Sequence, residues 1–305
     1  MANATKQLFL KELETRFGPL KKLSDSESLY EIQGTSTRVY VRYSRIHGRG
    51  QGFYGLRRTD LRSLEGHAAV LCFLWNGQTS PLLIPYSDYE QVFQTVAPAD
   101  DGQYKVQVYP EKEGVELYVP RAGRFNVEAF VGWSGLQSVI ETKTGNKIPE
   151  LGHSQVQTLL ASIGKRKGFD VWLPFIDRTK LDWSITTKFQ CSELLPSGFD
   201  SLRSVVQEVD VIWMVKGSGR VSALYEIEHS TPIYSGLLRF NDMLLTAPEV
   251  RPRFSIVAND IRREAFVRQV NRPTFRRSGL NEVCSFLDYA NVYYWHERTQ
   301  KQKEP

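Results

Sequence analysis

The sequence predicts two domains: a β-rich α+β domain at residues 1–145, and an α/β domain with a central mixed sheet flanked by helices at residues 146–305. Three observations support this prediction. Strand-like runs dominate the first half, a polar segment with glycine and proline follows at residues 141–149, and helical and strand-like runs alternate after it. A chain of 305 residues is long enough for each domain to bury its own core.

The first domain is predicted to begin with a helix and to continue mainly as strands. Leucine and phenylalanine recur at helical spacing over residues 6–17. Runs of β-forming residues, separated by Asn-Gly and Asp-Gly turns, follow at residues 38–42, 68–75 and 104–109. We therefore expect this domain to be built on sheet.

The second domain alternates helices with strands. Helices are predicted at residues 153–163, 231–245 and 260–270, and strands at residues 169–173, 205–213, 221–229 and 253–258. Two helix ends carry local signals. Gly164 is typical of the residue that follows a helix, whereas Thr231 and Pro232 are typical of an N-cap and a first helical residue.

The composition is that of a soluble globular protein with a modest net charge of +5. This charge is compatible with a polyanionic partner but does not require one. The chain has no apolar run long enough to span a bilayer, and its first residues lack the layout of a secretion signal. Cys72, Cys191 and Cys284 are few and far apart, so we expect free thiols and a cytoplasmic location.

Acidic residues interrupt two of the predicted strands. Asp210 lies in the run at 205–213, and Glu226 and Glu228 lie in the run at 221–229. Because side chains alternate between the faces of a strand, Glu226 and Glu228 should project from the same face. Burying carboxylates is costly unless a positive group pairs with them, and a divalent cation such as Mg²⁺ is an economical partner. The pattern indicates metal-assisted phosphodiester chemistry.

The stretch at residues 42–58 interleaves arginine with aromatic residues and glycines. It predicts a flexible loop that contacts DNA phosphates and reaches into a groove. The alternative is a glycine-rich hairpin with a solvated basic face. With the basic triplet at 165–167 included, the predicted DNA-binding residues are Arg42, Arg45, Arg49, Arg57, Arg58, Lys165 and Lys167.

The order of elements and acids over residues 153–270 resembles the PD-(D/E)xK nuclease superfamily, which includes restriction endonucleases. The resemblance implies that Asp210 is the metal-binding aspartate and that Glu226 is the first acid of the (D/E)-x-K motif. Both would then hold Mg²⁺. Glu228 stands where the motif usually has lysine, which makes this an E-x-E variant. It would accept a proton from the attacking water or hold a second ion.

This departure leaves the source of a catalytic lysine open, and Lys165, Lys167 and Lys216 are the alternatives. Many members of the superfamily also carry a metal-facing glutamate on the first helix, and Glu150 and Gln155 lie nearest to that position.

Two further polar groups receive local interpretations. Arg239 and Asp242 are spaced to form a surface pair on one helix, with phosphate steering by Arg239 as the alternative. His229 is predicted to be a packed or capping histidine.

The resemblance implies a Mg²⁺-dependent endodeoxyribonuclease of restriction type that acts on double-stranded DNA. Its N-terminal domain would recognise the DNA, its C-terminal domain would cleave it, and a homodimer would cut both strands. Two alternatives remain open: a catalytically inactive DNA-binding protein with the nuclease fold, or a structure-specific repair or recombination nuclease.

Overall fold

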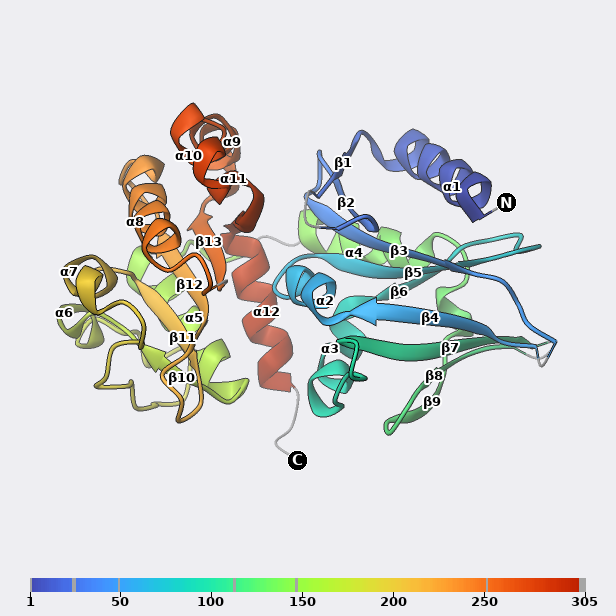
Figure 1. The fold of residues 1–305 in the computed structure, drawn as a ribbon, viewed down its shortest axis with the longest axis horizontal. Coiled ribbons are helices and arrows are strands. Elements are labelled where there is room, and N and C mark those ends of the chain that lie inside the picture. The colour runs from blue at the N-terminus through green and yellow to red at the C-terminus, as the bar shows by residue number, and fades with distance from the viewer. Residues whose placement is uncertain are drawn as a thin grey trace. The chain divides into compact units, whose positions relative to one another are not determined.

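The computed structural model describes residues 2–23, 26–48, 50–111, 114–145, 148–250 and 252–301. The chain divides into two compact units, Met1–Lys147 and Ile148–Pro305, called the N-terminal and C-terminal units below. This division lies two residues beyond the boundary predicted after residue 145, and residues 141–145 of the polar segment predicted there belong to a helix that ends at Gly145. Each unit has its own sheets and helices (Figure 1). Within the described ranges, no helix is both long and apolar enough to cross a membrane.

The N-terminal unit is rich in strands, as its sequence predicts. Its sheets have the strand orders β1-β2-β3-β5-β6 and β4-β7-β8-β9. The strands are β1 (Leu20–Lys22), β2 (Leu29–Ile32), β3 (Thr37–Ser44), β4 (Gly52–Arg57), β5 (Ala69–Trp75), β6 (Leu82–Pro85), β7 (Gln103–Glu111), β8 (Gly114–Val119) and β9 (Gly123–Asn126). The helices are α1 (Ala2–Phe17), α2 (Arg58–Leu64), α3 (Tyr86–Thr95), α4 (Ser134–Gly145) and the 3-10 turn η1 (Glu128–Phe130).

The sheet β4-β7-β8-β9 buries one face and exposes the other. Along β4, Tyr54 and Leu56 are buried, whereas Phe53 and Arg57 are exposed. Every strand pair in this sheet is antiparallel. Alternation of this kind is typical of an antiparallel sheet with one solvated face.

The prediction of a flexible loop over residues 42–58 is wrong at both ends of that range. Arg42 belongs to β3, residues 52–57 form β4, and α2 begins at Arg58. The connection between the strands is closed by an antiparallel bridge between Ile46 and Gly52. Only this connection resembles the alternative interpretation, a glycine-rich hairpin, because β3 and β4 themselves lie in different sheets. The β-forming flanks pair with β5 and β7, and this pairing outweighs the flexibility expected from the glycines.

The C-terminal unit contains one mixed sheet of strand order β10-β11-β12-β13-β14. The pairs β10–β11 and β11–β12 are antiparallel, and β12–β13 and β13–β14 are parallel. The strands are β10 (Phe169–Trp172), β11 (Val211–Val215), β12 (Val221–Ile227), β13 (Arg253–Ala258) and β14 (Cys284–Asp288). The helices are α5 (His153–Arg166), α6 (Phe175–Arg178), η2 (Asp200–Leu202), α7 (Arg203–Val206), α8 (Ile233–Thr246), η3 (Asp260–Arg262), α9 (Arg263–Val270), α10 (Pro273–Ser278), α11 (Leu280–Val283) and α12 (Tyr289–Lys301).

Helices cover both faces of this sheet (Figure 1). On one face, Trp213 and Tyr225 pack with apolar residues of α5 and α12. On the other face, Ile212 and Leu224 pack with α8 and the helices that follow it. From Val211 to Met214 and from Ala223 to Ile227, odd-numbered side chains therefore face α5 and α12, and even-numbered ones face α8. Glu226 shares its parity with Leu224 and thus faces α8.

Two strand boundaries differ from the prediction, and this changes where the acidic residues lie relative to their strands. The strand predicted at 205–213 is in fact α7 followed by a turn, and β11 begins only at Val211. Val206 and Val209 are buried in the core beside α8, so packing overrides their β propensity. Asp210 therefore immediately precedes the strand. β12 ends at Ile227, so Glu228 immediately follows its strand.

Both predicted helix-end signals are wrong in detail. Gly164 lies inside α5, where a Cβ atom would come within 2.5 Å of Trp213 Nε1. Glycine serves there to let the helix approach the sheet. Pro232, not Thr231, occupies the N-cap position of α8, and the Thr231 hydroxyl donates to the Glu228 carboxylate instead. Cys72, Cys191 and Cys284 are free thiols, as the sequence predicts.

Candidate active site

Asp210 and Glu226 lie opposite each other at one end of the C-terminal sheet. The ladder between β11 and β12 pairs Val211 with Tyr225, and Asp210 and Glu226 are the next residues beyond that pair. The amide of Ile227 donates a hydrogen bond of 2.6 Å to Asp210 Oδ2. Residues opposite each other on paired strands are near neighbours, and the Asp210 charge acts on Glu226, so the two are called the carboxylate cluster below.

Glu226 is only 1% exposed and forms a two-pronged ion pair with Arg239 of α8. Arg239 Nε donates to Oε1 at 2.8 Å, and Nη2 donates to Oε2 at 2.6 Å. The predicted surface pair of Arg239 with Asp242 is therefore wrong. A buried carboxylate needs a cation, and the planar guanidinium matches it with two parallel bonds.

Two opposing influences act on the ionisation of Glu226. Burial raises the pKa of this carboxyl above its ordinary value, whereas the hydrogen bonds from Arg239 lower it. The Asp210 charge adds to the upward shift. Because the guanidinium is always charged and both carboxylate oxygens accept from it, the pair has the geometry of an ionised one.

The first turn of α5 holds Asp210. His153 Nε2 lies 3.2 Å from Asp210 Oδ1, and this hydrogen bond raises the pKa of His153. Gln157, four residues along the same helix face, donates to the Asp210 carbonyl oxygen at 2.9 Å. The Gln157 amide also lies 3.5 Å from Asp177 Oδ2 of α6.

Glu228 faces the same helix as Glu226 but binds its first turn. Its Oε1 accepts from the Gly236 amide at 3.0 Å and from Ser235 Oγ at 3.3 Å. A carboxylate at this place is stabilised by the positive end of the helix. Gly236 permits this approach, because a Cβ atom there would lie 2.7 Å from Glu228 Oε1 and 2.9 Å from Glu226 Cβ. Glu228 thus has a structural role in addition to the catalytic one predicted for it.

None of the three lysines considered as substitutes lies at this end of the sheet. Lys165 and Lys167 lie at the far end of α5, about 18–21 Å along the helix axis from His153. Lys216 follows β11 at the end of the strand opposite to Asp210. All three belong to the same unit as the carboxylates, but the helix and strand lengths separate them from the site.

Glu150 and Gln155 do not take the place of the metal-facing glutamate. The Gln155 side chain accepts from the Gly152 amide at 2.9 Å and donates to Asp182 at 3.1 Å, so it caps α5. Glu150 is exposed. His153 is the side chain of this segment that reaches Asp210.

The sequence also contained a usable signal for Arg239. The inward face of α8 is marked by Gly236, Phe240 and Met243, and Arg239 lies three residues after Gly236. An arginine beside such a face, following a strand with buried acids, indicates an ion pair across to the sheet. His229 is exposed, but its ring stacks on Tyr289 and its Nδ1 lies 3.2 Å from the tyrosine hydroxyl, so the predicted packing is confirmed only in part.

The predicted DNA-binding residues differ in accessibility. Arg45, Arg57 and Arg58 are exposed. Arg42 is half-buried, with its guanidinium 5.9 Å from the centre of the Tyr40 ring. Arg49 lies outside the described residues. The remaining two, Lys165 and Lys167, are half-buried at the end of α5.

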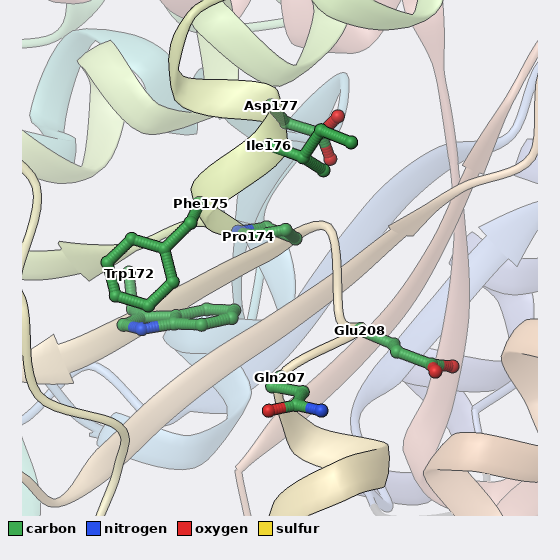
Figure 2. A pocket seen from close by; sticks show the side chains of 7 residues that line it. All are labelled: Trp172, Pro174, Phe175, Ile176, Asp177, Gln207 and Glu208. Carbon is green, nitrogen blue, oxygen red and sulfur yellow. The ribbon is translucent and has the colours of Figure 1, made fainter.

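A pocket of about 400 Å³ opens between the start of α6 and the turn before Asp210. Figure 2 shows the rings of Trp172 and Phe175 on one side of it and the carboxylates of Asp177 and Glu208 on the other. Asp177 is joined to Asp210 through Gln157. Glu208 Oε2 lies 3.7 Å from Arg239 Nη1. The pocket therefore adjoins the carboxylate cluster.

Comparison with known proteins places the C-terminal unit in a family. A family model described as the Type II restriction enzyme NmeDI C-terminal domain matches residues 136–303, more than half of the chain. The Type II restriction enzyme NmeDI of Neisseria meningitidis serogroup C is 34% identical over 150 residues, which cover 46% of this chain and 41% of that enzyme. No solved structure matches the chain. The chain belongs to the family of the NmeDI C-terminal domain.

Proposed function

We propose that this protein is a Mg²⁺-dependent endodeoxyribonuclease of restriction type with a PD-(D/E)xK-like C-terminal unit. The observation that carries the proposal is the position of Asp210 and Glu226 directly beyond the Val211–Tyr225 pair of β11 and β12, in a unit that belongs to a restriction-enzyme family. In this proposal the N-terminal unit recognises double-stranded DNA, and two copies of the chain act together to cut both strands.

The donor set suits a hard divalent cation. Among the described residues no group of three or more His, Cys, Asp and Glu side chains is arranged to hold a metal ion. Mg²⁺, however, commonly uses one or two carboxylates and takes its other ligands from water and phosphate. Asp210 and Glu226 are such a pair. A bound ion would lower the pKa of a water molecule and neutralise charge on the scissile phosphate.

Arg239 is the competitor for this site. Both Glu226 oxygens accept from its guanidinium, so Glu226 can bind a cation only when Arg239 gives up at least one of these bonds. Arg239 is 26% exposed and also lies near Glu208, which lets it turn toward solvent or a phosphate. The proposed role of Arg239 is to keep Glu226 ionised in the free protein and to contact the DNA backbone in the complex.

His153 is proposed to orient Asp210. Its Nε2 binds one carboxylate oxygen while the Ile227 amide binds the other, so the carboxylate plane is fixed between α5 and β12. A ligand held in this way loses little freedom when it binds a cation.

Cleavage of plasmid DNA with and without Mg²⁺ tests the proposed function. Asp210→Asn and Glu226→Gln should each reduce cleavage at least about a hundredfold, because each removes a charge that the cation requires. Asp242→Asn is the matched control, since Asp242 is an exposed acid on α8, and it should retain wild-type cleavage. Full activity of the Asp210 or Glu226 variant would refute the assignment.

A second candidate function is that of an inactive DNA-binding protein with the nuclease fold. The ion pair that occupies both Glu226 oxygens favours it, as does Glu228 at the position of the lysine. Calorimetric titration with Mn²⁺ separates the two functions. A nuclease should bind the ion in the wild type and lose binding in Asp210→Asn, whereas an inactive protein should show no binding in either.

A further inference from the structure

The pocket beside the candidate active site has the shape and chemistry of a site for a flat ring. Trp172 and Phe175 meet edge to face with their ring centres 6.4 Å apart, which makes an aromatic corner. Trp172 is buried, whereas Phe175 is 61% exposed and Ile176 beside it is 72% exposed. A flat ligand in this corner would cover apolar surface that is otherwise in contact with water.

The corner is held rigidly. The Arg178 guanidinium lies 4.2 Å from the centre of the Phe175 ring. Its Nε donates to the Leu173 carbonyl at 3.1 Å, and its Nη2 donates to the Ser192 carbonyl at 2.7 Å. A ring fixed from behind in this way offers its open face for stacking at little entropic cost.

The polar lining selects against a phosphate. The pocket is lined by Asp177, Gln207 and Glu208, and no Lys or Arg is among its lining residues. Lys180 donates to Asp177 Oδ1 at 2.9 Å, so Asp177 is already partly satisfied. The Glu208 side chain is 64% exposed, and although its Oε2 lies 3.7 Å from Arg239 Nη1, its other oxygen remains available as an acceptor. A carboxylate beside an aromatic corner suits a neutral ring that carries amino groups.

We propose that this pocket binds a nucleobase that has left the DNA stack next to the scissile phosphate. This inference rests on the proposed nuclease function. Glu208 accepts from the exocyclic amino group, so the pocket prefers cytosine, adenine or guanine to thymine, which has no amino group. Enzymes that extrude a base read it by this combination of stacking and edge contacts.

The position of the pocket explains why the base would be that of the reacting nucleotide. On one wall of the pocket, Asp177 lies 3.5 Å from the Gln157 amide, which donates to the Asp210 carbonyl oxygen. On the other wall, Glu208 lies 3.7 Å from Arg239. A phosphate at the carboxylate cluster would therefore have its own nucleoside beside this opening.

The ¹⁵N signals of the tryptophan indoles provide a test that does not depend on cleavage. The full chain has six tryptophans, and Trp172→Phe identifies the Trp172 signal. The wild type is titrated with deoxycytidine, with thymidine and with 2-deoxyribose. We expect deoxycytidine to move the Trp172 signal, thymidine to act at least about tenfold more weakly, and 2-deoxyribose to have no effect.

Two exposed positions supply the variants. Glu208→Gln should weaken deoxycytidine binding about tenfold and reduce the preference over thymidine, and Phe175→Ala should weaken both nucleosides at least about fivefold. Leu194→Ala, at a residue 78% exposed and outside the pocket lining, should change neither. Absence of any Trp172 response, or equal responses to the two nucleosides, would overturn the inference.

Duplex DNA completes the test once the cut position has been mapped. In complexes with the cleavage-deficient Asp210→Asn protein, 2-aminopurine next to that position should become more fluorescent, and Phe175→Ala introduced into the same protein should abolish the increase. Cleavage by the wild type without any such signal would refute the base pocket and leave the nuclease function standing. Absence of cleavage in the wild type would refute the function, while the nucleoside titration would still report on the pocket.

Discussion

At the scale of single residues, the site depends on which hydrogen-bond partners each of its three carboxylates has. Glu226 is satisfied by Arg239, Glu228 by the first turn of α8, and Asp210 by His153 and the Ile227 amide. The alternation of side chains along a strand predicted that Glu226 and Glu228 share a face. It could not predict their partners, because these come from helices that the strand meets only in the folded unit.

Removal of Arg239 should destabilise the C-terminal unit. Arg239→Leu leaves Glu226 buried without a cation, and we expect a loss of about 3 kcal/mol in the free energy of unfolding. The double variant Glu226→Leu with Arg239→Leu should recover most of this loss, because it removes the unpaired charge as well. Urea unfolding of the two single variants and the double variant measures the coupling. If the double variant loses as much stability as the two single variants together, the two side chains do not stabilise each other.

His296 should make stability depend on pH. Its side chain is buried on α12, and burial, with the nearby charge of Arg166, lowers its pKa to about 4 from the usual 6.5. The unfolded chain therefore binds a proton that the folded chain resists. Stability should be complete above about pH 6.5 and decline by up to about 3 kcal/mol as the pH falls to about 4.

The variant His296→Gln should flatten this part of the stability curve, measured by urea unfolding at intervals between pH 4 and 7. His47→Gln serves as the control because His47 is exposed in the N-terminal unit, and it should leave the slope unchanged. An unaltered slope in His296→Gln would show that other groups cause the acid sensitivity.

At the scale of elements, the predictions were most reliable for long periodic segments. The helices α1, α5, α8 and α9 and the strands β3, β5, β7, β12 and β13 all lie where the sequence predicts them. The errors lie at short segments. Val206 and Val209 have strand propensity, but their burial beside α8 selects a helical turn followed by a bend. Local propensity is a weak influence when packing opposes it.

Gly164 should be intolerant of even one additional carbon atom. Alanine normally stabilises a helix relative to glycine by about 1 kcal/mol. Here the added Cβ would lie 2.5 Å from Trp213 Nε1, which itself donates to the Leu160 carbonyl and cannot easily move. We expect Gly164→Ala to lower the free energy of unfolding by about 1–3 kcal/mol.

Thermal unfolding of Gly164→Ala and of Gly34→Ala provides the measurement. At Gly34 a Cβ atom would find nothing within 4 Å among the described residues, so that variant should be close to the wild type. A Gly164→Ala protein that is more stable than the wild type would contradict close packing of α5 against β11.

At the scale of the whole molecule, the chain combines a family-specific C-terminal unit with an N-terminal unit that the family model barely enters. The exposed face of the sheet β4-β7-β8-β9 carries Phe53 and Arg57, and Arg58 begins the next helix. An exposed sheet face with arginine and aromatic side chains suits contact with nucleic acid. Its proposed role in DNA recognition can be tested through charge.

Replacement of both Arg57 and Arg58 by glutamine should weaken binding to all DNA sequences alike. For every phosphate that the variant no longer neutralises, the slope of log K against log salt concentration should become shallower by about 0.9. The double variant Lys11→Gln with Lys21→Gln is the control, because it removes the same charge at exposed positions on α1 and β1. If the slope is unchanged in the arginine variant, or changes equally in both, these arginines do not bind phosphates specifically.

Residue spacing along the chain was enough to predict a strand-rich first half, alternating helices and strands in the second half, and a shared face for Glu226 and Glu228. These features follow from backbone geometry that repeats every two or every 3.6 residues. The mixed sheet and the role of Asp210 beside Glu226 were expected from the resemblance to a nuclease superfamily. The pairing of Arg239 with Glu226, the hold of His153 on Asp210 and the distance of the substitute lysines from the site emerged only from the folded unit. Such contacts depend on how closely a helix can approach the sheet, and Gly164 and Gly236 set that distance because they have no side chain.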